Sequence, residues 1–252
     1  KYDPWVNTAF KRARLLISSI PDSHRGIKKY KKIDSVLIPE TSSFITESVP
    51  MKRFYDDNFH VMWVAKFDFC KQLPLALRSL AATKNKQIIL DIYGKGNETI
   101  EKKVRQLAKE LNISDQITWH GHKPKAVVQQ AMRTSQLFFF TSVSEDTSTV
   151  VLEAISNHLP VLCFDACGFG GVIDETVGRK IPLTNLQRSV TDFAEYLNQF
   201  YANRSLLENL SLNCKQLQQQ LSWDEKAKKV VDLYQKVVSE FETTANDKKD
   251  AR

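Results

Sequence analysis

Two glutamates in the stretch SVSEDTSTVVLEA (142–154) have a spacing that could do chemistry. Glu145 precedes a predicted helix start at Thr147 or Ser148, and Glu153 lies inside that helix. The first N–H groups of a helix are unpaired and its N-terminus is positive, so a phosphate is favoured there. A carboxylate beside it needs another role, and carboxylates accept hydrogen bonds from adjacent hydroxyls. The pattern therefore predicts a ligand with phosphate and sugar groups, such as a nucleotide-sugar.

Two lysines add a second pair of charges. Lys66 lies at the end of a predicted strand, and Lys71 follows five residues later at the start of a predicted helix. Both would project over the same edge of a sheet, where two cations can clamp a diphosphate. Taken alone, each pair is explained as well or better by ordinary surface charge. The two pairs together, on two strand-to-helix corners of one sheet, favour a binding site.

The elements that must position these residues alternate along the chain from His60 onward. Short apolar segments are followed by segments with apolar residues at helical spacing, which indicates a parallel sheet with right-handed crossovers. We predict an α/β fold, a Rossmann-like parallel sheet with helices on both faces. The predicted strands are 60–67, 87–93, 116–120, 136–141 and 160–165, and the predicted helices are 71–84, 98–112, 125–134 and 148–157.

The two ends of the chain differ from this middle part. Residues 190–220 predict two helices broken near Asn203, and 222–241 predicts another, with Ser222 as N-cap and Glu225 completing a capping box. The polar segment after Phe241 is predicted to be disordered.

The order of the predicted elements divides the chain into three segments. We expect 1–50 to be the remnant of an N-terminal domain with its linker, because its two short strands cannot form a domain alone. Residues 51–220 would bind the nucleotide-sugar, and 221–252 would form the C-terminal helix and tail. Because the chain begins with a lysine, we expect a fragment or a processed product of a longer protein.

The composition restricts the class of ligand only in part. The chain has 252 residues, 42% of them hydrophobic, and a net charge of +7. That charge suits phosphorylated ligands, an anionic membrane or nucleic acid. The four cysteines lack the two pairs of a tetrahedral site, and His120 and His122 lack a third ligand nearby, so no metal site is expected. No apolar segment is long enough to span a bilayer.

In the residues that carry this pattern, the chain resembles the C-terminal half of retaining GT-B glycosyltransferases of the group 1 type, family 4. The resemblance covers roughly residues 15–240. The matching segments are the lysine pair, DIYGKGNE (91–98), ITWHGH (117–122), SEDTSTVVLEAISNHLPVL (144–162) and LSWDEKAKKVVDLY (221–234).

The resemblance implies a role for each matching residue. Glu153 would hold the ribose hydroxyls and Glu145 the transferred sugar, while Lys66 and Lys71 would contact the diphosphate. His122 would line the base. The backbone N–H groups that would cradle the distal phosphate belong to Thr147, Ser148 and Thr149.

Three positions depart from the family pattern. Lys66 replaces an arginine, which loses bidentate contact. Asp146 and Gln72 each stand where glycine is usual, and Asp146 adds negative charge beside the expected phosphate site.

The resemblance also implies a reaction. We expect transfer of a hexosyl group from a nucleotide-sugar to an acceptor hydroxyl with retention of configuration, on a glycan or lipid-linked acceptor. No cofactor and no nucleic acid partner are expected. The absent N-terminal domain would supply acceptor contacts and a catalytic histidine, so the fragment should be inactive alone, and no catalytic residue is named.

The sequence also bears on the location of the protein in the cell and on other possible functions. A cytoplasmic protein is expected, and the basic run 24–32 offers peripheral contact with the inner membrane face. A non-catalytic nucleotide-binding module on the same fold, an epimerase and a phosphorylase stay open as alternatives.

Overall fold

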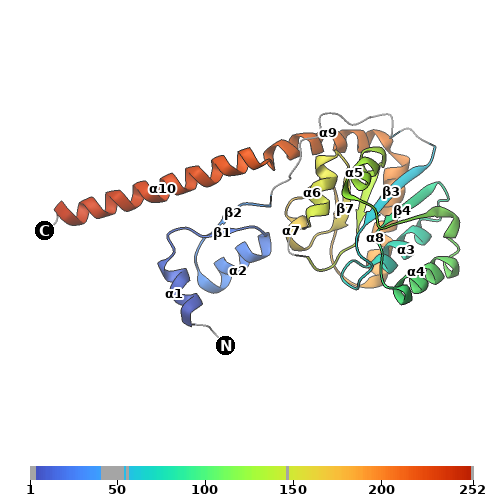
Figure 1. The fold of residues 1–252 in the computed structure, drawn as a ribbon, viewed down its shortest axis with the longest axis horizontal. Helices are drawn as coiled ribbons and strands as arrows, with labels where there is room; N and C mark the ends of the chain where they lie inside the picture. Colours follow the sequence, from blue (N-terminus) through green and yellow to red (C-terminus); the bar gives the residue numbers. More distant parts are fainter. Residues whose placement is uncertain (1–3, 41–53, 55–56, 146–147, 251–252) are drawn as a thin grey trace.

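A six-stranded parallel sheet lies within the larger body of the molecule, at the end away from the two chain termini (Figure 1). The structure, a computed structural model, describes residues 4–40, 54, 57–145 and 148–250, with backbone only over 244–250. The strands lie in the order β5-β4-β3-β6-β7-β8. Their bounds are β3 Phe59–Val64, β4 Ile88–Tyr93, β5 Ile117–Gly121, β6 Leu137–Phe140, β7 Val161–Phe164 and β8 Gly178–Ile181.

The predicted α/β fold with a parallel sheet is confirmed. Two central strands show why the sequence specifies it, because β6 and β7 are apolar throughout and every residue in them is buried. A strand covered on both faces needs no polar alternation. Phe138, Phe139 and Phe140 accordingly project to both faces and are at most 1% exposed.

The chain reverses its direction of travel across the sheet between β3 and β6. From β3 it steps outward through β4 to β5, and it then returns to the other side of β3 to continue through β6, β7 and β8. The pair β3–β6 is aligned with Val61 opposite Leu137. Such a reversal is a topological switch point, where open α/β sheets bind ligands beyond the carboxyl ends of the strands.

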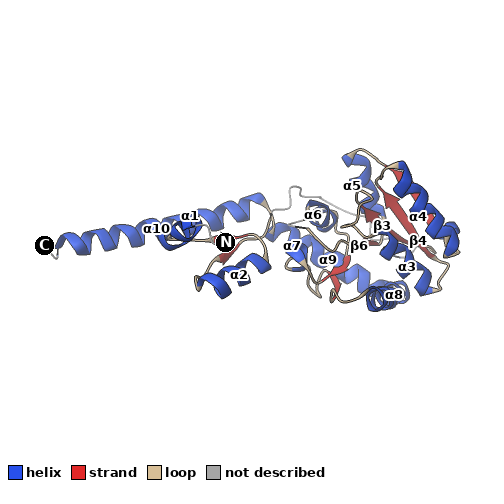
Figure 2. Ribbon diagram, turned by 90° about the horizontal axis from the view of Figure 1, so that it is seen from below, coloured by secondary structure: helices blue, strands red, loops and turns tan. Residues whose placement is uncertain are grey.

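Helices cover both faces, as predicted. Figures 1 and 2 show α5 and α6 on one side of the sheet and α3 and α8 on the other. The bounds are α3 Leu73–Thr83, α4 Glu98–Glu110, α5 Lys125–Thr134, α6 Thr149–Ser156, α7 Cys167–Gly170, α8 Leu186–Ala202, α9 Arg204–Gln220 and α10 Trp223–Asp250, with a 3₁₀ turn at Ser114–Gln116.

Three features differ from the expected elements. The edge strand β8 was not expected, because its sequence GRKI has only one large apolar residue. It fits through Gly178, where a side chain would meet the Val161 carbonyl oxygen at 2.0 Å. The segment CGFGG (167–171), where no helix was expected, contains the short helix α7. Helix α10 continues to Asp250, which corrects the disordered tail after Phe241: polar residues without glycine or proline do not end a helix.

The N-terminal residues form a small unit of their own. It comprises α1 Pro4–Arg12, β1 Ile17–Ser18, α2 Pro21–Lys31 and β2 Val36–Leu37, and the two strands pair in parallel. The unit makes a separate two-stranded sheet, and α2 lies against α7. Helix α10 also extends past it, and Arg14 stacks over the Phe241 ring at 5.6 Å (Figure 1).

A buried carboxylate links three strands on the outer half of the sheet. Asp91 of β4 accepts hydrogen bonds from His60 of β3 at 2.7 Å and from His120 of β5 at 2.9 Å. Burial raises the pKa of Asp91, but these hydrogen bonds outweigh it and hold the pKa below its ordinary value. His120 also stacks on Tyr93 at 4.1 Å, which holds the end of β5 in place.

We predict that Asp91→Asn lowers the free energy of unfolding at neutral pH by about 1.5–3 kcal/mol, the value of hydrogen bonds to a charged group. A carboxyl with a lowered pKa stabilises above its unfolded pKa and loses that contribution as the pH falls through the folded one. The difference between parent and variant should therefore persist down to the ordinary pKa of 3.8 and vanish below it.

Urea unfolding between pH 7 and pH 3 measures this difference. Asp115→Asn, at an exposed carboxylate, is the control and should change stability by less than about 0.5 kcal/mol. A difference that is as large at pH 3 as at pH 7 would contradict the assignment.

Candidate functional site

A cavity of about 670 Å³ lies at the switch point, over the carboxyl ends of β3 and β6. We call it the switch-point cavity. Its wall contains every sequence-predicted site residue that the structure describes, namely Lys66, Lys71, His122, Glu145, Ser148, Thr149 and Glu153. Thr147, the remaining predicted residue, lies outside the described residues, as does Asp146. The fold thus gathers residues from four segments at one edge of the sheet.

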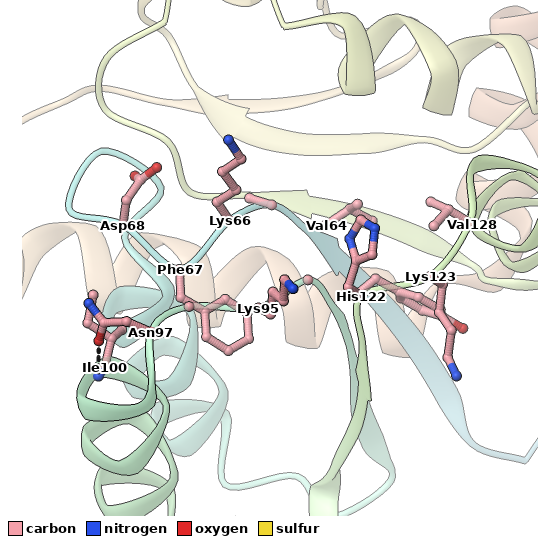
Figure 3. Close-up of a pocket in the computed structure, with 14 residues that line it drawn as sticks. Val64, Lys66, Phe67, Asp68, Lys95, Asn97, Ile100, His122, Lys123 and Val128 are labelled. Carbon is pink, nitrogen blue, oxygen red and sulfur yellow. Dashed lines mark hydrogen bonds between the residues drawn. The ribbon is translucent and has the colours of Figure 1, made fainter.

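A neighbouring cavity of about 640 Å³ continues from it toward β4 and α4. The two cavities share Lys66, His122 and Lys123. In Figure 3, Lys66 and Asp68 come from the loop after β3, while His122 and Lys123 come from the loop after β5. Apolar side chains that include Phe67 and Val128 complete the wall, so this part suits a flat and less polar group.

Lys71 and Glu145 form an ion pair inside the switch-point cavity. Their side chains are only 21% and 16% exposed, so the pair is largely shielded from water. The Ser142 hydroxyl lies 3.0 Å from the same carboxylate, and the Glu145 backbone N–H donates to the Cys167 sulfur at 3.3 Å. Lys71 is therefore already engaged with one of the two glutamates.

Lys125 and Glu153 form the second ion pair, with 2.7 Å between Nζ and Oε1. The Glu153 side chain is 17% exposed and the Lys125 side chain 55%. Lys125 was not among the sequence-predicted site residues. Its place as the first residue of α5 could have indicated it, since that helix begins at the same edge of the sheet.

The cations and the helix start complete the electrostatics of the cavity. Lys66 is exposed and makes no ion pair with another described residue. Ser148 is the N-cap of α6, and its hydroxyl makes no capping hydrogen bond. The Ser148 side chain therefore does not occupy the N–H groups at the start of α6, where the dipole is positive and favours an anion.

Comparison with known protein families shows which family this sequence matches. Residues 45–217 match the family described as glycosyl transferases group 1. The chain belongs to this family. The fold agrees, since solved structures of GT-B glycosyltransferases superpose on most of the chain.

Two curated relatives share part of their sequence with this chain. The GtfA subunit of UDP-N-acetylglucosamine–peptide N-acetylglucosaminyltransferase from Streptococcus gordonii is 35% identical over 31% of the chain and 15% of its own length. The D-inositol 3-phosphate glycosyltransferase of Nocardia farcinica is 27% identical over 54% of the chain and 30% of its own length. The chain thus spans less than a third of either relative.

Two solved structures show the same fold. The pneumococcal O-GlcNAc transferase GtfA, in complex with UDP and GlcNAc, aligns with a TM-score of 0.68 and 17% identity over 93% of this chain and 47% of its own. Anabaena HepE in complex with UDP aligns with a TM-score of 0.74 and 15% identity over 92% of this chain and 66% of its own.

In this chain, hydrogen bonds of Thr141 join the two sides of the switch point. The buried Thr141 hydroxyl accepts from the Trp63 indole at 3.0 Å and donates to the Lys71 carbonyl oxygen at 2.8 Å. Nearby, the Val143 N–H donates to the Cys70 carbonyl oxygen at 2.9 Å. The loop that carries Glu145 is thereby fixed against the corner that carries Lys71.

The backbone of the same corner favours glycine at position 72. Gln72 has a φ of 52°, in the left-handed region, and its carbonyl oxygen accepts from Leu75 and Ala76 at the start of α3. A side chain in that region costs about 1–2 kcal/mol relative to the ordinary conformation. The sequence departure at Gln72 therefore affects stability rather than ligand contact.

Neither a metal nor a membrane span is indicated by the part of the chain described. No three His, Cys, Asp or Glu side chains there are arranged to hold a metal ion. None of the described helices is long and apolar enough to cross a membrane.

We predict that Thr141→Val lowers the free energy of unfolding by about 1–3 kcal/mol, because it leaves the Trp63 N–H and the Lys71 carbonyl without a buried partner. Urea unfolding followed by tryptophan fluorescence measures the loss. Thr118→Val makes the same chemical change at an exposed strand position and should stay within about 0.5 kcal/mol of the parent. Equal effects of the two substitutions would contradict the role of Thr141.

We expect Gln72→Gly to raise the free energy of unfolding by up to about 1 kcal/mol, since relief of the left-handed strain exceeds the added entropy of the unfolded chain. Gln72→Ala removes the same side chain but keeps the strain, so it should give no increase. Thermal unfolding of both variants provides the comparison, and an equal gain for alanine would exclude backbone strain as the cause.

Proposed function

We propose that this chain is the donor-binding half of a retaining glycosyltransferase that moves a hexosyl group from a nucleotide-sugar to an acceptor hydroxyl. The observation that supports it best is the switch-point cavity, which is lined by two glutamates, four lysines and the start of α6. A nucleotide-sugar has the matching groups, with diols on either side of a diphosphate. In this proposal residues 51–220 form the donor-binding unit.

Each residue has a role in this proposal. Glu153 accepts hydrogen bonds from the ribose hydroxyls, and Glu145 accepts them from the transferred sugar. Lys66 contacts the diphosphate directly. Lys71 has three N–H donors, so it can bridge Glu145 and a phosphate oxygen at once.

The remaining residues surround the two ends of the ligand. The backbone N–H groups at Thr147, Ser148 and Thr149 receive the distal phosphate, as helix starts do. His122 forms part of the wall beside the base, where the neighbouring apolar cavity begins.

In the proposed reaction, negative charge develops on the departing diphosphate. The bond between the anomeric carbon and the diphosphate oxygen breaks, and a bond to the acceptor oxygen forms on the same face. The proton of the acceptor hydroxyl passes to the departing phosphate oxygen. The cations and the N–H groups of α6 stabilise the negative charge that collects on the leaving group. The chain supplies no base in this route, and the acceptor would be held by residues outside it.

The relatives guide the choice of donor and acceptor to test. The similar proteins include a subunit of a UDP-N-acetylglucosamine–peptide N-acetylglucosaminyltransferase and two proteins whose structures were solved in complex with UDP. We therefore propose a UDP-sugar as the donor and a glycan, peptide or lipid-linked hydroxyl as the acceptor. Helix α2, with Lys28, Lys29 and Lys31 near its end, would provide peripheral contact with an anionic membrane.

We predict that one nucleoside diphosphate among UDP, GDP, ADP and CDP binds the protein, and that Glu153→Ala weakens it about 10- to 150-fold, the effect of losing hydrogen bonds to a charged group. Calorimetric titration measures both affinities. Glu110→Ala removes an equal charge at the far end of α4, away from the cavity, and should leave the affinity unchanged.

The outcomes separate the candidate functions. Equal affinity of parent and Glu153→Ala would exclude the ribose assignment. Diphosphate binding without sugar transfer by the full-length protein would instead favour a non-catalytic nucleotide-binding module.

A further inference from the structure

We propose that Lys125 is a positioning residue that holds Glu153 for the ribose and thereby makes the site select ribonucleotides over 2′-deoxyribonucleotides. The inference rests on the proposed function, because it takes Glu153 as the ribose carboxylate. It adds a residue that the sequence did not indicate.

The distance between Lys125 and Glu153 supports this role. Lys125 Nζ lies 2.7 Å from Glu153 Oε1, which is the length of a charge-assisted hydrogen bond. An ionised carboxylate has two oxygens with about four lone-pair sites. Glu153 can therefore keep Lys125 on Oε1 and still accept hydrogen bonds from two ribose hydroxyls.

The burial of Glu153 explains why it needs a cationic partner. Glu153 lies on α6 with a side chain only 17% exposed, so its charge has little access to water. A shielded carboxylate is costly without a counter-ion, and a glutamate side chain has several rotamers to choose from. The cation both compensates the charge and limits the carboxylate to rotamers that face the cavity.

The backbone places Lys125 for this contact. Pro124 is the N-cap of α5 with φ −57° and ψ 150°, so the extended chain turns into the helix at Lys125. Helix α5 packs beside α6, which brings its first residue over the side chain of Glu153. Lys123, two residues earlier, lines both cavities from the same loop but makes no ion pair with another described residue.

Direct contact of Lys125 with a phosphate is the alternative role for this cation. The two roles differ in what the ligand must contain. A phosphate contact would act equally on ribose and deoxyribose diphosphates, whereas a contact through Glu153 acts only where the 2′-hydroxyl is present. The ratio of the two affinities is therefore a readout that a structural or general charge effect would leave unchanged.

The experiment measures the affinities of UDP and 2′-deoxy-UDP, with the ADP, GDP and CDP pairs tested likewise, by calorimetry. The proteins are the parent, Lys125→Met, Lys125→Arg and Lys123→Met, each checked for an unchanged unfolding temperature. Methionine keeps the apolar stem and removes the charge. Arginine keeps the charge and can restore the pair.

For the diphosphate that binds, the parent should favour the ribose form about 10-fold or more, the value of one hydrogen bond to a charged group. Lys125→Met should lose most of that preference by weakening the ribose form alone. Lys125→Arg should restore it, and Lys123→Met should lower both affinities by one small common factor.

Two results would overturn the inference while leaving the proposed function intact. One is an equal loss for both sugars in Lys125→Met, which assigns Lys125 to the phosphates. The other is the same behaviour for Lys125→Met and Lys123→Met. A parent that binds none of the four diphosphates overturns both this inference and the proposed function.

Discussion

The hydroxyl of Thr141 is the contact on which the site depends. It accepts a hydrogen bond from the indole of β3 and donates one to the first turn of the corner before α3, so it joins the two strands at the switch point. The strands alone would leave their loops free to diverge. With this buried link, the glutamate loop after β6 and the lysine corner after β3 are held at the separation that lets Lys71 reach Glu145.

Charge at this edge is arranged as pairs rather than as a uniformly positive patch. Each glutamate in the cavity has its own lysine, and Lys66 is left for an incoming anion. The pairs restrain the carboxylates before a ligand arrives, which reduces the ordering that binding must otherwise supply.

Much of this could be predicted from the sequence. The strands were recognisable because β6 and β7 are uninterrupted apolar runs, and the start of α6 was marked by Ser148. The carboxyl-edge rule then placed Glu145 and Lys66 together. The pairing of Lys125 with Glu153 was not predicted, because it forms through the packing of α5 on α6, and only the place of Lys125 at the start of α5 pointed to it. Strand β8 was missed because Gly178 fits it by close approach and not by hydrophobic pattern.

The parallel pair of β3 and β6 has a consequence for the order of folding. The Thr141 hydrogen bond to Lys71 spans 70 positions in the chain. Closing so long a segment is entropically slow, whereas the units from β3 to β5 can form from nearer contacts. The binding edge is therefore completed late, after the outer strands have assembled. Under the proposed function, a nucleotide that bridges both sides of this closure would stabilise the last step and so raise the yield of folded protein.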